Sequence, residues 1–377
     1  MPAHKHYMQR AIALAKKASG QVTPNPLVGC VVVNHNKIVG EGYHQVCGQA
    51  HAEVNALNDA GKQAKGSTIY VTLEPCSHKG KTPPCANAII NAGVSRVVYA
   101  VADPNPTASG GAALLREHGI ETIQGLEENA AQHLARFFLH HVRFGTPYVV
   151  AKYASSIDGK IACHTGNSQW ITGELARHRS HELRQSVDGI LVGAQTVIDD
   201  NPSLTVRLPE TTLAKQSLRN PIRFVLDSTG RVPLDSALFQ TKDDAQTQVL
   251  TTERMPADHV AQLENRGVTV TQIDTDPSTQ RVSIPAMLNM LGKQGVQSIM
   301  VEGGQSVLGA LMDQRAINET WAFFAPKFIG GAAAPGPIGG KGIDAMPQAA
   351  SLCNVVHEQL GNDWLIRGDM QYMRGCT

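Results

Sequence analysis

The feature that most constrains the fold of this sequence is an alternation of short apolar segments with helical segments, which occurs in two successive cycles. The first cycle begins with a helical segment at 4–18, capped by Gly20, and a hairpin pattern at 28–44. It continues with helical segments at 51–61, 83–93 and 130–141 and strand-like segments at 67–74 and 95–103. Such alternation predicts a sheet with helices on its faces, that is, an α/β fold.

The second cycle follows the segment FGTP at 144–147. Its strand-like segments lie at 147–160, 188–193, 221–228, 248–252, 298–304 and 321–331, its helical segments at 174–186 and 305–314, and a Gly/Pro-rich loop at 330–342. A chain of 377 residues is longer than one hydrophobic core usually supports. We therefore expect two α/β domains, 1–146 and 147–377.

The balance of charges excludes several classes of protein. Lys and Arg number 33 against 32 Asp and Glu, and no long basic run occurs, so a nucleic-acid-binding footprint is absent. The sequence has no apolar run long enough for a membrane helix, and MPAHKHYMQR does not resemble a signal peptide. We expect a cytoplasmic protein without membrane or nucleic-acid partners.

Seven cysteines, an odd number, favour reduced thiols or metal ligands over a disulfide framework.

Three potential metal ligands occur at the starts of two helical segments. His51 opens the segment 51–61, and Cys76 and Cys85 lie near the start of the next helix. One imidazole and two thiolates suit a tetrahedral zinc with its fourth position left for water, as in catalytic sites. Glu53 could take a proton from that water and return it to a leaving amine. The pattern predicts a zinc deaminase that replaces C–NH2 with C=O. A closed zinc knot or buried cysteines would be the alternative, and Cys30 is expected in the core.

Several longer motifs make the first half more specific. TLEPCSHKGKTPPC (72–85), TPNPLVGCVVV (23–33), GEGYH (40–44), HAEVNAL (51–57) and DPNP (103–106) closely resemble the pyrimidine deaminase domain of the bifunctional riboflavin-biosynthesis deaminase/reductase family. Eight residues separate Cys76 from Cys85, unlike the Pro-Cys-x-x-Cys of cytidine deaminases, and TASGGA (107–112) departs from the family's usual Gly-x-Gly segment.

The resemblance implies residues that surround the pyrimidine and the ribose phosphate. These are Asn25, His44, Lys79, Asp103 and Asn105. Asn25 and Asn105 could equally be ordinary turn residues, and Lys79 a solvated loop charge.

Motifs of the second half resemble the reductase domain of the same family. They are YASSIDGKIA (153–162), SQWIT (168–172), GAQTVIDDNPSLTVR (193–207), FVLDS (224–228), VEGG (301–304) and FFAPKFIGG (323–331). Taken alone, SIMVEGGQSVLGAL (298–311) is only a strand, a Gly-Gly turn and a helix whose N-terminus could hold an anion. The resemblance implies a cytidine-deaminase-like three-layer α/β/α domain followed by a dihydrofolate-reductase-like α/β domain.

The same resemblance implies zinc and NADPH as cofactors and a pyrimidine ribosyl phosphate as substrate. NADPH would lie against Ala154, Trp170, Thr196, Asp200, Ser228, Gly304, Gln305 and Ser306. The substrate would contact Lys152, Ser168, Arg184, Leu204, Arg207 and Glu302. A guanidinium fork at Arg184 or Arg207 suits phosphate, although either could form a surface ion pair.

Hydride transfer to C1′ would convert the ribosyl side chain to ribityl. Asp200 or Glu302 could supply a proton, but a binding role suits either better, and a homo-oligomer through the reductase domain is expected. Two other functions are alternatives: a nucleic-acid or nucleoside deaminase with an accessory domain, and a zinc-stabilised binding module. Neutral charge and the reductase motifs oppose the first, and Glu53 beside an open three-ligand site opposes the second.

Overall fold

The computed structural model describes residues 2–78, 83–209, 218–240 and 245–372. The chain divides into two compact units, which we call unit 1 (Met1–Gly145) and unit 2 (Thr146–Thr212 with Leu218–Thr377). Within the described ranges, no helix has the length and apolar character needed to cross a membrane.

Unit 1 consists of a five-stranded sheet and six α-helices among its described residues. The strands are β1 (Gly29–Asn34), β2 (Lys37–Tyr43), β3 (Thr68–Leu73), β4 (Arg96–Val101) and β5 (Glu121–Gln124). The helices are α1 (Pro2–Ala15), α2 (Ala52–Ala60), α3 (Cys85–Asn91), α4 (Gly111–Glu117), α5 (Glu128–Leu134) and α6 (Arg136–Phe144).

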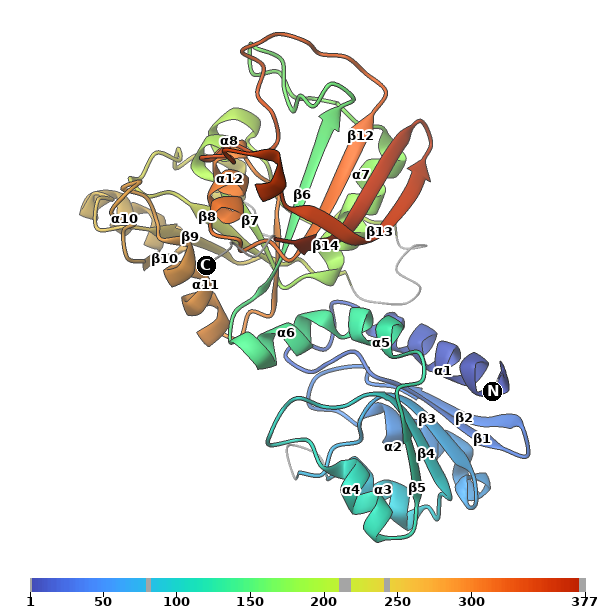
Figure 1. The fold of residues 1–377 in the computed structure, drawn as a ribbon. Helices are drawn as coiled ribbons and strands as arrows, with labels where there is room; N and C mark the ends of the chain where they lie inside the picture. The colour runs from blue at the N-terminus through green and yellow to red at the C-terminus, as the bar shows by residue number, and fades with distance from the viewer. Residues whose placement is uncertain (1, 79–82, 210–217, 241–244, 373–377) are drawn as a thin grey trace. The chain divides into compact units, whose positions relative to one another are not determined.

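The sheet of unit 1 has the order β2-β1-β3-β4-β5 and is covered on both faces, which makes three layers (Figure 1). Strands β1 and β2 form the predicted antiparallel hairpin, and β3, β4 and β5 are parallel. A Cβ atom added to Gly29 would lie 2.0 Å from the Ala11 carbonyl oxygen of α1, and one added to Gly42 would lie 2.4 Å from the Ala56 nitrogen of α2. In the hairpin, Gly42 is paired with Cys30, the residue next to Gly29 on β1. Paired residues share a face and successive residues along a strand alternate, so Gly29 and Gly42 face opposite sides of the sheet, and α1 and α2 lie on opposite faces.

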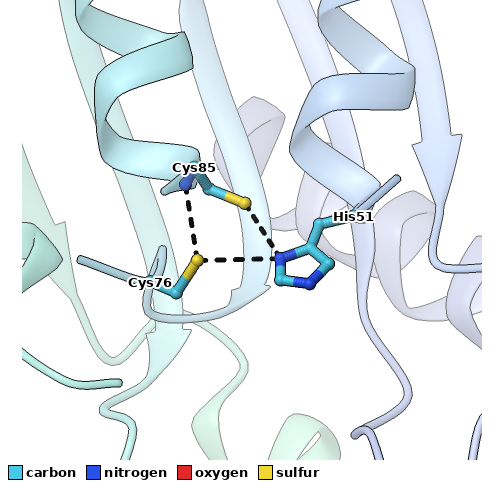
Figure 2. A group of neighbouring side chains, drawn as sticks. All are labelled: His51, Cys76 and Cys85. Carbon is cyan, nitrogen blue, oxygen red and sulfur yellow. Dashed lines mark hydrogen bonds between the residues drawn. The ribbon is translucent and has the colours of Figure 1, made fainter. Parts of the chain in front are cut away.

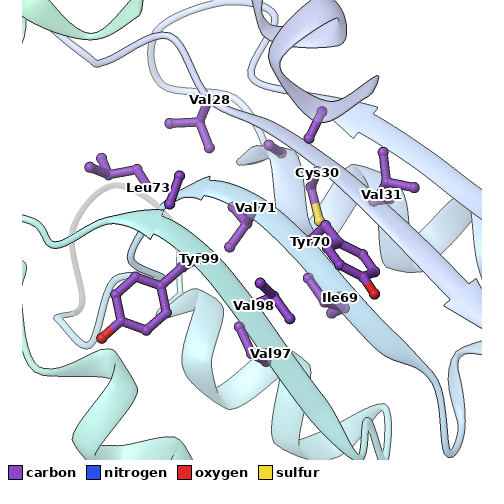
Figure 3. Packing of buried hydrophobic residues seen from close by; sticks show 14 of the residues in the cluster. Val28, Cys30, Val31, Ile69, Tyr70, Val71, Leu73, Val97, Val98 and Tyr99 are labelled. Atoms are coloured by element: carbon purple, nitrogen blue, oxygen red, sulfur yellow. The ribbon is translucent and has the colours of Figure 1, made fainter. Parts of the chain in front are cut away.

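The core of unit 1 is built on its central strands. Val31, Ile69, Val71 and Val97 are fully buried, and Figure 3 shows these aliphatic side chains packed along β1, β3 and β4. Helices cover both faces, so every position of these strands faces a core, and their sequences are continuously apolar. Cys30 is buried in the core, as predicted.

Unit 2 is a larger α/β unit. Its strands are β6 (Tyr148–Ser156), β7 (Gly189–Gly193), β8 (Ile222–Leu226), β9 (Thr247–Thr251), β10 (Thr269–Gln272), β11 (Ser298–Val301), β12 (Glu319–Ala325), β13 (Ser351–Leu360) and β14 (Asp363–Gln371). Its helices are α7 (Glu174–Ser186), α8 (Ala194–Asp200), α9 (Ala237–Gln240), α10 (Ala257–Glu264), α11 (Ile284–Lys293) and α12 (Gln305–Asp313).

The sheet of unit 2 has the order β10-β9-β8-β7-β11-β6-β12-β14-β13. The strands from β10 to β12 in this order are parallel, and the β13–β14 hairpin adds an antiparallel edge. Successive residues of β7 enter different cores, since Leu191 packs in one buried cluster and Ile190 and Val192 pack in another. Because the strands from β10 to β12 run in the same direction, their carboxyl ends share one edge of the sheet, where ligands bind in such folds.

Two predictions about secondary structure need correction, and several elements were not predicted. The helix predicted at 130–141 is two helices, α5 and α6, because Ala135 leaves helical geometry at φ −93° and ψ 10°. The strand predicted to reach residue 331 ends at Ala325. Several elements were not predicted, namely α4, β5, α8, α9, α10, β10, α11, β13 and β14.

Candidate active sites

Two helix starts bring the three predicted metal ligands of unit 1 together. His51 is the residue before α2, Cys85 is the first residue of α3, and Cys76 lies in the loop after β3. Figure 2 shows the three side chains converging between the two helices. Their ligand atoms all lie within 4.8 Å of one another.

The distances between these side chains suit one tetrahedral zinc. His51 Nδ1 lies 3.1 Å from Cys85 Sγ and 3.6 Å from Cys76 Sγ. A nitrogen and a sulfur bound to one tetrahedral zinc, at about 2.0–2.1 Å and about 2.3 Å, lie about 3.6 Å apart. The backbone N–H of Cys85 donates to Cys76 Sγ at 3.3 Å, which supports the thiolate form. The residues present fit the metal.

Glu53 lies in the first turn of α2, next to the metal ligands. Its side chain is only 4% exposed. Burial raises the pKa of Glu53 to about 7, and the Cys76 thiolate adds to this effect. Hydrogen bonding from the Cys85 thiol, assisted by His51, lowers the pKa of Cys76 to about 4. A carboxyl group with a pKa near neutrality can both accept and return a proton.

His44 and Asn25 are linked to the metal-ligand cluster by a series of side-chain contacts. His44 Nδ1 lies 3.1 Å from the Ala50 carbonyl oxygen, so Nδ1 carries the hydrogen. The Asn25 amide then donates to His44 Nε2 at 2.9 Å. The His44 ring meets the His51 ring edge-on with centroids 5.3 Å apart, and burial lowers the pKa of His44. His44 therefore lies beside the metal ligand His51, and Asn25 is connected to it through His44.

The DPNP loop of unit 1 is held against the cysteine loop by Glu74, which sequence reasoning missed. Glu74 Oε1 accepts the backbone N–H groups of Gly110 at 3.2 Å and Ala112 at 3.0 Å, and Oε2 accepts that of Asp103 at 3.3 Å. The signal for Glu74 was its place between the buried strand β3 and Pro75-Cys76.

Asp103 and Asn105 also close local turns. Asp103 Oδ1 accepts the Asn105 N–H at 2.9 Å, and Asn105 Oδ1 accepts the Thr107 hydroxyl at 2.8 Å. Burial raises the pKa of Asp103. The turn role considered for Asn105 is thus present, and Lys79 lies outside the described residues.

Unit 2 contains a cleft of about 2240 Å³ along the carboxyl ends of its parallel strands. All the residues predicted to bind NADPH or substrate in this half line it. They come from β6, α7, α8, the loops after β6, α8, β8 and β11, and the start of α12. The Gly/Pro-rich segment also lines the cleft, and the Gly339 N–H donates to the Gln305 carbonyl at 3.0 Å while the Lys341 N–H donates to Asp313 Oδ2 at 2.9 Å.

A buried carboxylate flanked by two cations lies in this cleft. Arg184 Nη2 lies 2.6 Å from Glu302 Oε1, and Lys152 Nζ lies 3.8 Å from Glu302 Oε2. Burial would raise the pKa of Glu302, but the charges of Arg184 and Lys152 outweigh it and lower the pKa to about 2. Arg184 Nη1 also donates to the Thr205 carbonyl at 2.5 Å. The Arg184 ion pair is therefore buried, not on the surface.

The other predicted residues differ in their exposure. Arg207 is exposed, and its Nη1 donates to Ser203 Oγ at 3.1 Å. Ser168 Oγ donates to Asp200 Oδ1 at 2.8 Å. Trp170 is 62% exposed, with the Arg177 guanidinium 4.7 Å from the centre of its ring. Leu204 is buried and adopts a left-handed backbone with φ 54°, which is uncommon for a bulky residue.

Family models match both halves of the chain. The model of the cytidine and deoxycytidylate deaminase zinc-binding region matches residues 1–101, and the model of the RibD C-terminal domain matches residues 147–366. The riboflavin biosynthesis protein RibD of Bacillus amyloliquefaciens is 45% identical over 360 residues, which cover 95% of this chain and 94% of the relative.

The chain belongs to the RibD family.

Other RibD proteins give the same result. The Escherichia coli (strain K12) protein is 41% identical over 344 residues, covering 86% of this chain and 88% of its own. The structure of Acinetobacter baumannii RibD, form 1, matches with a TM-score of 0.85 at 35% identity, covering 98% of this chain and 99% of that one. A Thermotoga maritima diaminohydroxyphosphoribosylaminopyrimidine deaminase/5-amino-6-(5-phosphoribosylamino)uracil reductase matches with a TM-score of 0.83 at 36% identity, covering 99% of both chains.

These matches confirm the main sequence predictions. The fold combines a cytidine-deaminase-like and a dihydrofolate-reductase-like α/β unit, and the protein is a bifunctional deaminase and reductase of riboflavin biosynthesis that acts on a small molecule. The zinc-binding region and the His51, Cys76 and Cys85 cluster support zinc as the metal, and the reductase fold indicates a nucleotide cofactor. The alternative of a nucleic-acid deaminase is not favoured.

Proposed function

We propose that this protein deaminates 2,5-diamino-6-ribosylamino-4(3H)-pyrimidinone 5′-phosphate and then reduces the ribosyl side chain of the product to ribityl with NADPH. The Thermotoga maritima relative is named as a deaminase and reductase of this kind. The observation that carries the proposal here is that one chain combines a His/Cys/Cys cluster beside a buried glutamate with a cleft lined by the predicted reductase residues.

For the deaminase site, we propose that His51, Cys76 and Cys85 hold one zinc per chain. Zinc with three protein ligands supplies Lewis-acid activation of water. Glu53 is the group that moves the proton, because it is buried next to the ligands and its pKa lies near neutrality. Asn25, His44, Lys79, Asp103 and Asn105 are proposed to bind the substrate. Among these, the Asn25 amide is oriented by His44, whose own tautomer is set by the Ala50 carbonyl.

For the reductase site, we propose that NADPH binds to Ala154, Trp170, Thr196, Asp200, Ser228, Gly304, Gln305 and Ser306. The cofactor supplies the hydride, and the protein orients the reacting groups. The start of α12 at Gly304 presents backbone N–H groups that suit an anionic part of the cofactor. Lys152, Ser168, Arg184, Leu204, Arg207 and Glu302 are proposed to bind the substrate.

The buried ion pairs narrow the choice of a proton donor in the reductase site. Glu302 has a pKa of about 2, so it is ionised at neutral pH and cannot act as a general acid. Asp200, the other candidate from the sequence, accepts a hydrogen bond from Ser168 at Oδ1, which suits the binding role proposed for it above. We propose that Glu302 instead binds a hydroxyl or amino group of the substrate while Arg184 and Lys152 stabilise its charge.

We further propose that zinc chemistry is confined to 1–146 and hydride chemistry to 147–377. A homo-oligomer through the reductase domain and a cytoplasmic location remain predictions.

One assay tests the two activities together. The purified full-length protein is incubated with the diamino substrate, with and without NADPH, and the products are identified by mass. We expect ammonia and the deaminated ribosyl compound without NADPH, and the ribityl compound with it. Absence of deamination in the zinc-loaded protein, or of reduction in the presence of NADPH, would contradict the corresponding half of the proposal.

A further inference from the structure

His181 lines the cleft of unit 2 but has no role in the assignments above. It lies on α7, three residues before Arg184, so the two side chains lie on the same side of the helix. The ring is half-buried. Its charged neighbours are Arg184 on the same helix, Arg207, Lys152 on β6 and Glu302 after β11. His181 is therefore a half-buried ring that lies among three cationic side chains of the cleft.

One hydrogen bond settles which ring nitrogen of His181 carries the hydrogen. The backbone N–H of Arg207 donates to His181 Nδ1 at 3.2 Å, so Nδ1 is an acceptor and Nε2 carries the hydrogen. Burial, followed by the charges of Arg184 and Arg207, lowers the pKa of His181 to about 4. The ring is neutral near pH 7. Among the residues with described positions, Nε2 has no hydrogen-bond partner, and this leaves one N–H donor available in the cleft.

The charges around His181 suit a dianion. Lys152, Arg184 and Arg207 contribute three positive charges and Glu302 one negative charge, so the net charge is +2. Arg184 uses Nε and Nη2 on Glu302 and Nη1 on the Thr205 carbonyl. Arg207 uses only Nη1, on the hydroxyls of Ser203 and Thr205. Near His181, the Arg207 guanidinium and His181 Nε2 therefore keep donors for a ligand, whereas the Lys152 ammonium faces Glu302 at 3.8 Å.

We propose that His181 and Arg207 together bind the 5′-phosphate of the substrate's sugar, with His181 Nε2 as a neutral hydrogen-bond donor. The proposal rests on the function proposed above. His181 would also position Arg207, because the hydrogen bond to Nδ1 holds the backbone from which that guanidinium extends. The phosphate groups of NADPH share the same chemistry, and the test separates them from the substrate phosphate.

Two substitutions separate the roles of the two ring nitrogens. Asn at position 181 can accept the Arg207 N–H near the place of Nδ1 but lacks the distal donor, whereas Gln places an amide donor near Nε2 and lacks the proximal acceptor. The full-length variants are assayed for reduction of the deaminated substrate and of its dephosphorylated form, and KM is measured for both and for NADPH. His178→Asn, on the same helix, is the matched control.

We expect His181→Asn to raise KM for the phosphorylated substrate about 10- to 100-fold, which corresponds to one hydrogen bond to a charged group. KM for the dephosphorylated substrate and for NADPH should stay within about threefold, and His181→Gln should retain most of the phosphate preference. An unchanged KM in His181→Asn, an equal change for both substrates, or a change confined to NADPH would overturn the proposal.

A measurement on the unmodified protein covers the case in which the variants do not fold. With ¹⁵N-labelled histidine, titration with ribose 5-phosphate should shift the protonated Nε2 resonance of His181, and no shift would contradict the proposal. If the wild type does not reduce the deaminated substrate at all, the proposed function fails. If it reduces the phosphorylated and dephosphorylated forms with equal KM, only the role of His181 and Arg207 fails.

Discussion

Two buried glutamates, one in each unit, have opposite electrostatic surroundings. Among the described residues, no cationic side chain forms an ion pair with Glu53 in unit 1, and burial raises its pKa to about 7. Glu302 in unit 2 is also largely buried, with 13% of its side chain exposed, but Arg184 and Lys152 lower its pKa to about 2. The same side chain is therefore suited to proton transfer in one unit and to fixed negative charge in the other. The difference shows that the partners of a carboxyl group, and not its burial, decide its role.

The two sites also differ in how the chain assembles them. The metal ligands of unit 1 lie within 35 residues of sequence, from His51 to Cys85, at the starts of two neighbouring helices. The cleft of unit 2 takes its residues from 152 to beyond 340, out of many separate loops. Metal binding in unit 1 should therefore depend on a few residues that are close in sequence, whereas ligand binding in the cleft of unit 2 should depend on many contacts of moderate strength from distant segments.

Loss of a metal ligand should produce the largest effect. In Cys85→Ser we expect zinc content and deamination to be lost together, because the thiolate is a ligand that a hydroxyl does not replace. Reduction of pre-deaminated substrate should persist. Zinc per chain and ammonia release are measured, with Cys47→Ser, a half-exposed cysteine, as the control. A variant with full zinc and full ammonia release would show that the ligand assignment is wrong.

Removal of the buried charge in unit 2 should produce an effect of intermediate size that depends on pH. The pKa of Glu302 falls from its ordinary value of 4.5 to about 2 on folding, so its contribution, about 3 kcal/mol, is present above pH 4.5 and disappears as the pH falls towards 2. Glu302→Gln should therefore be less stable than the wild type at pH 7, and the difference should shrink between pH 5 and pH 2.

Tryptophan fluorescence can report the stability of unit 2 selectively. All three tryptophans, Trp170, Trp321 and Trp364, belong to unit 2, so urea unfolding monitored by their emission reports on that unit. Exposed Glu264→Gln serves as the control. A stability difference that does not vary with pH would mean that the Glu302 charge is not held by Arg184 and Lys152.

A smaller effect is expected from Glu74. In Glu74→Ala the backbone N–H groups of Asp103, Gly110 and Ala112 lose their acceptor, so the DPNP loop should become less well positioned. We expect KM for deamination to rise about 10-fold, since a hydrogen bond to a charged group contributes about 1.5–3 kcal/mol. Glu74→Gln keeps one oxygen acceptor and should lose less. Steady-state kinetics decide this, and an unchanged KM in zinc-loaded Glu74→Ala would contradict the positioning role.

The convergence of His51, Cys76 and Cys85 could be predicted from the sequence because its determinants are local. His51, Glu53 and Cys85 each lie at a helix start, and Cys76 follows the buried strand β3, so the order of elements brings them together. The fold class followed from the alternation of elements for the same reason. The arrangement of the metal ligands in unit 1 could thus be predicted without knowing any contact between segments that are distant in the sequence.

Other features depend on contacts between distant segments. The buried pair of Arg184 and Glu302 joins residues 118 apart, and His181 becomes a candidate only through its bond to the Arg207 backbone. The strands β13 and β5 were missed because their residues are mostly exposed and lack alternation of apolar and polar side chains. The break at Ala135 has no Gly or Pro to mark it.

The central claim is that unit 1 and unit 2 carry separate and successive reactions, and the intermediates that accumulate test it most directly. Glu53→Gln and Lys152→Ala are incubated with the diamino substrate and NADPH, with exposed Glu117→Gln and Lys293→Ala as matched controls. We expect Glu53→Gln to deaminate about 10²–10⁴-fold more slowly and to accumulate the diamino compound, while still reducing pre-deaminated substrate. Lys152→Ala should accumulate the deaminated, unreduced compound. If folded Lys152→Ala lost deamination as severely as reduction, or if Glu53→Gln lost both activities, the separation of the two reactions would be contradicted.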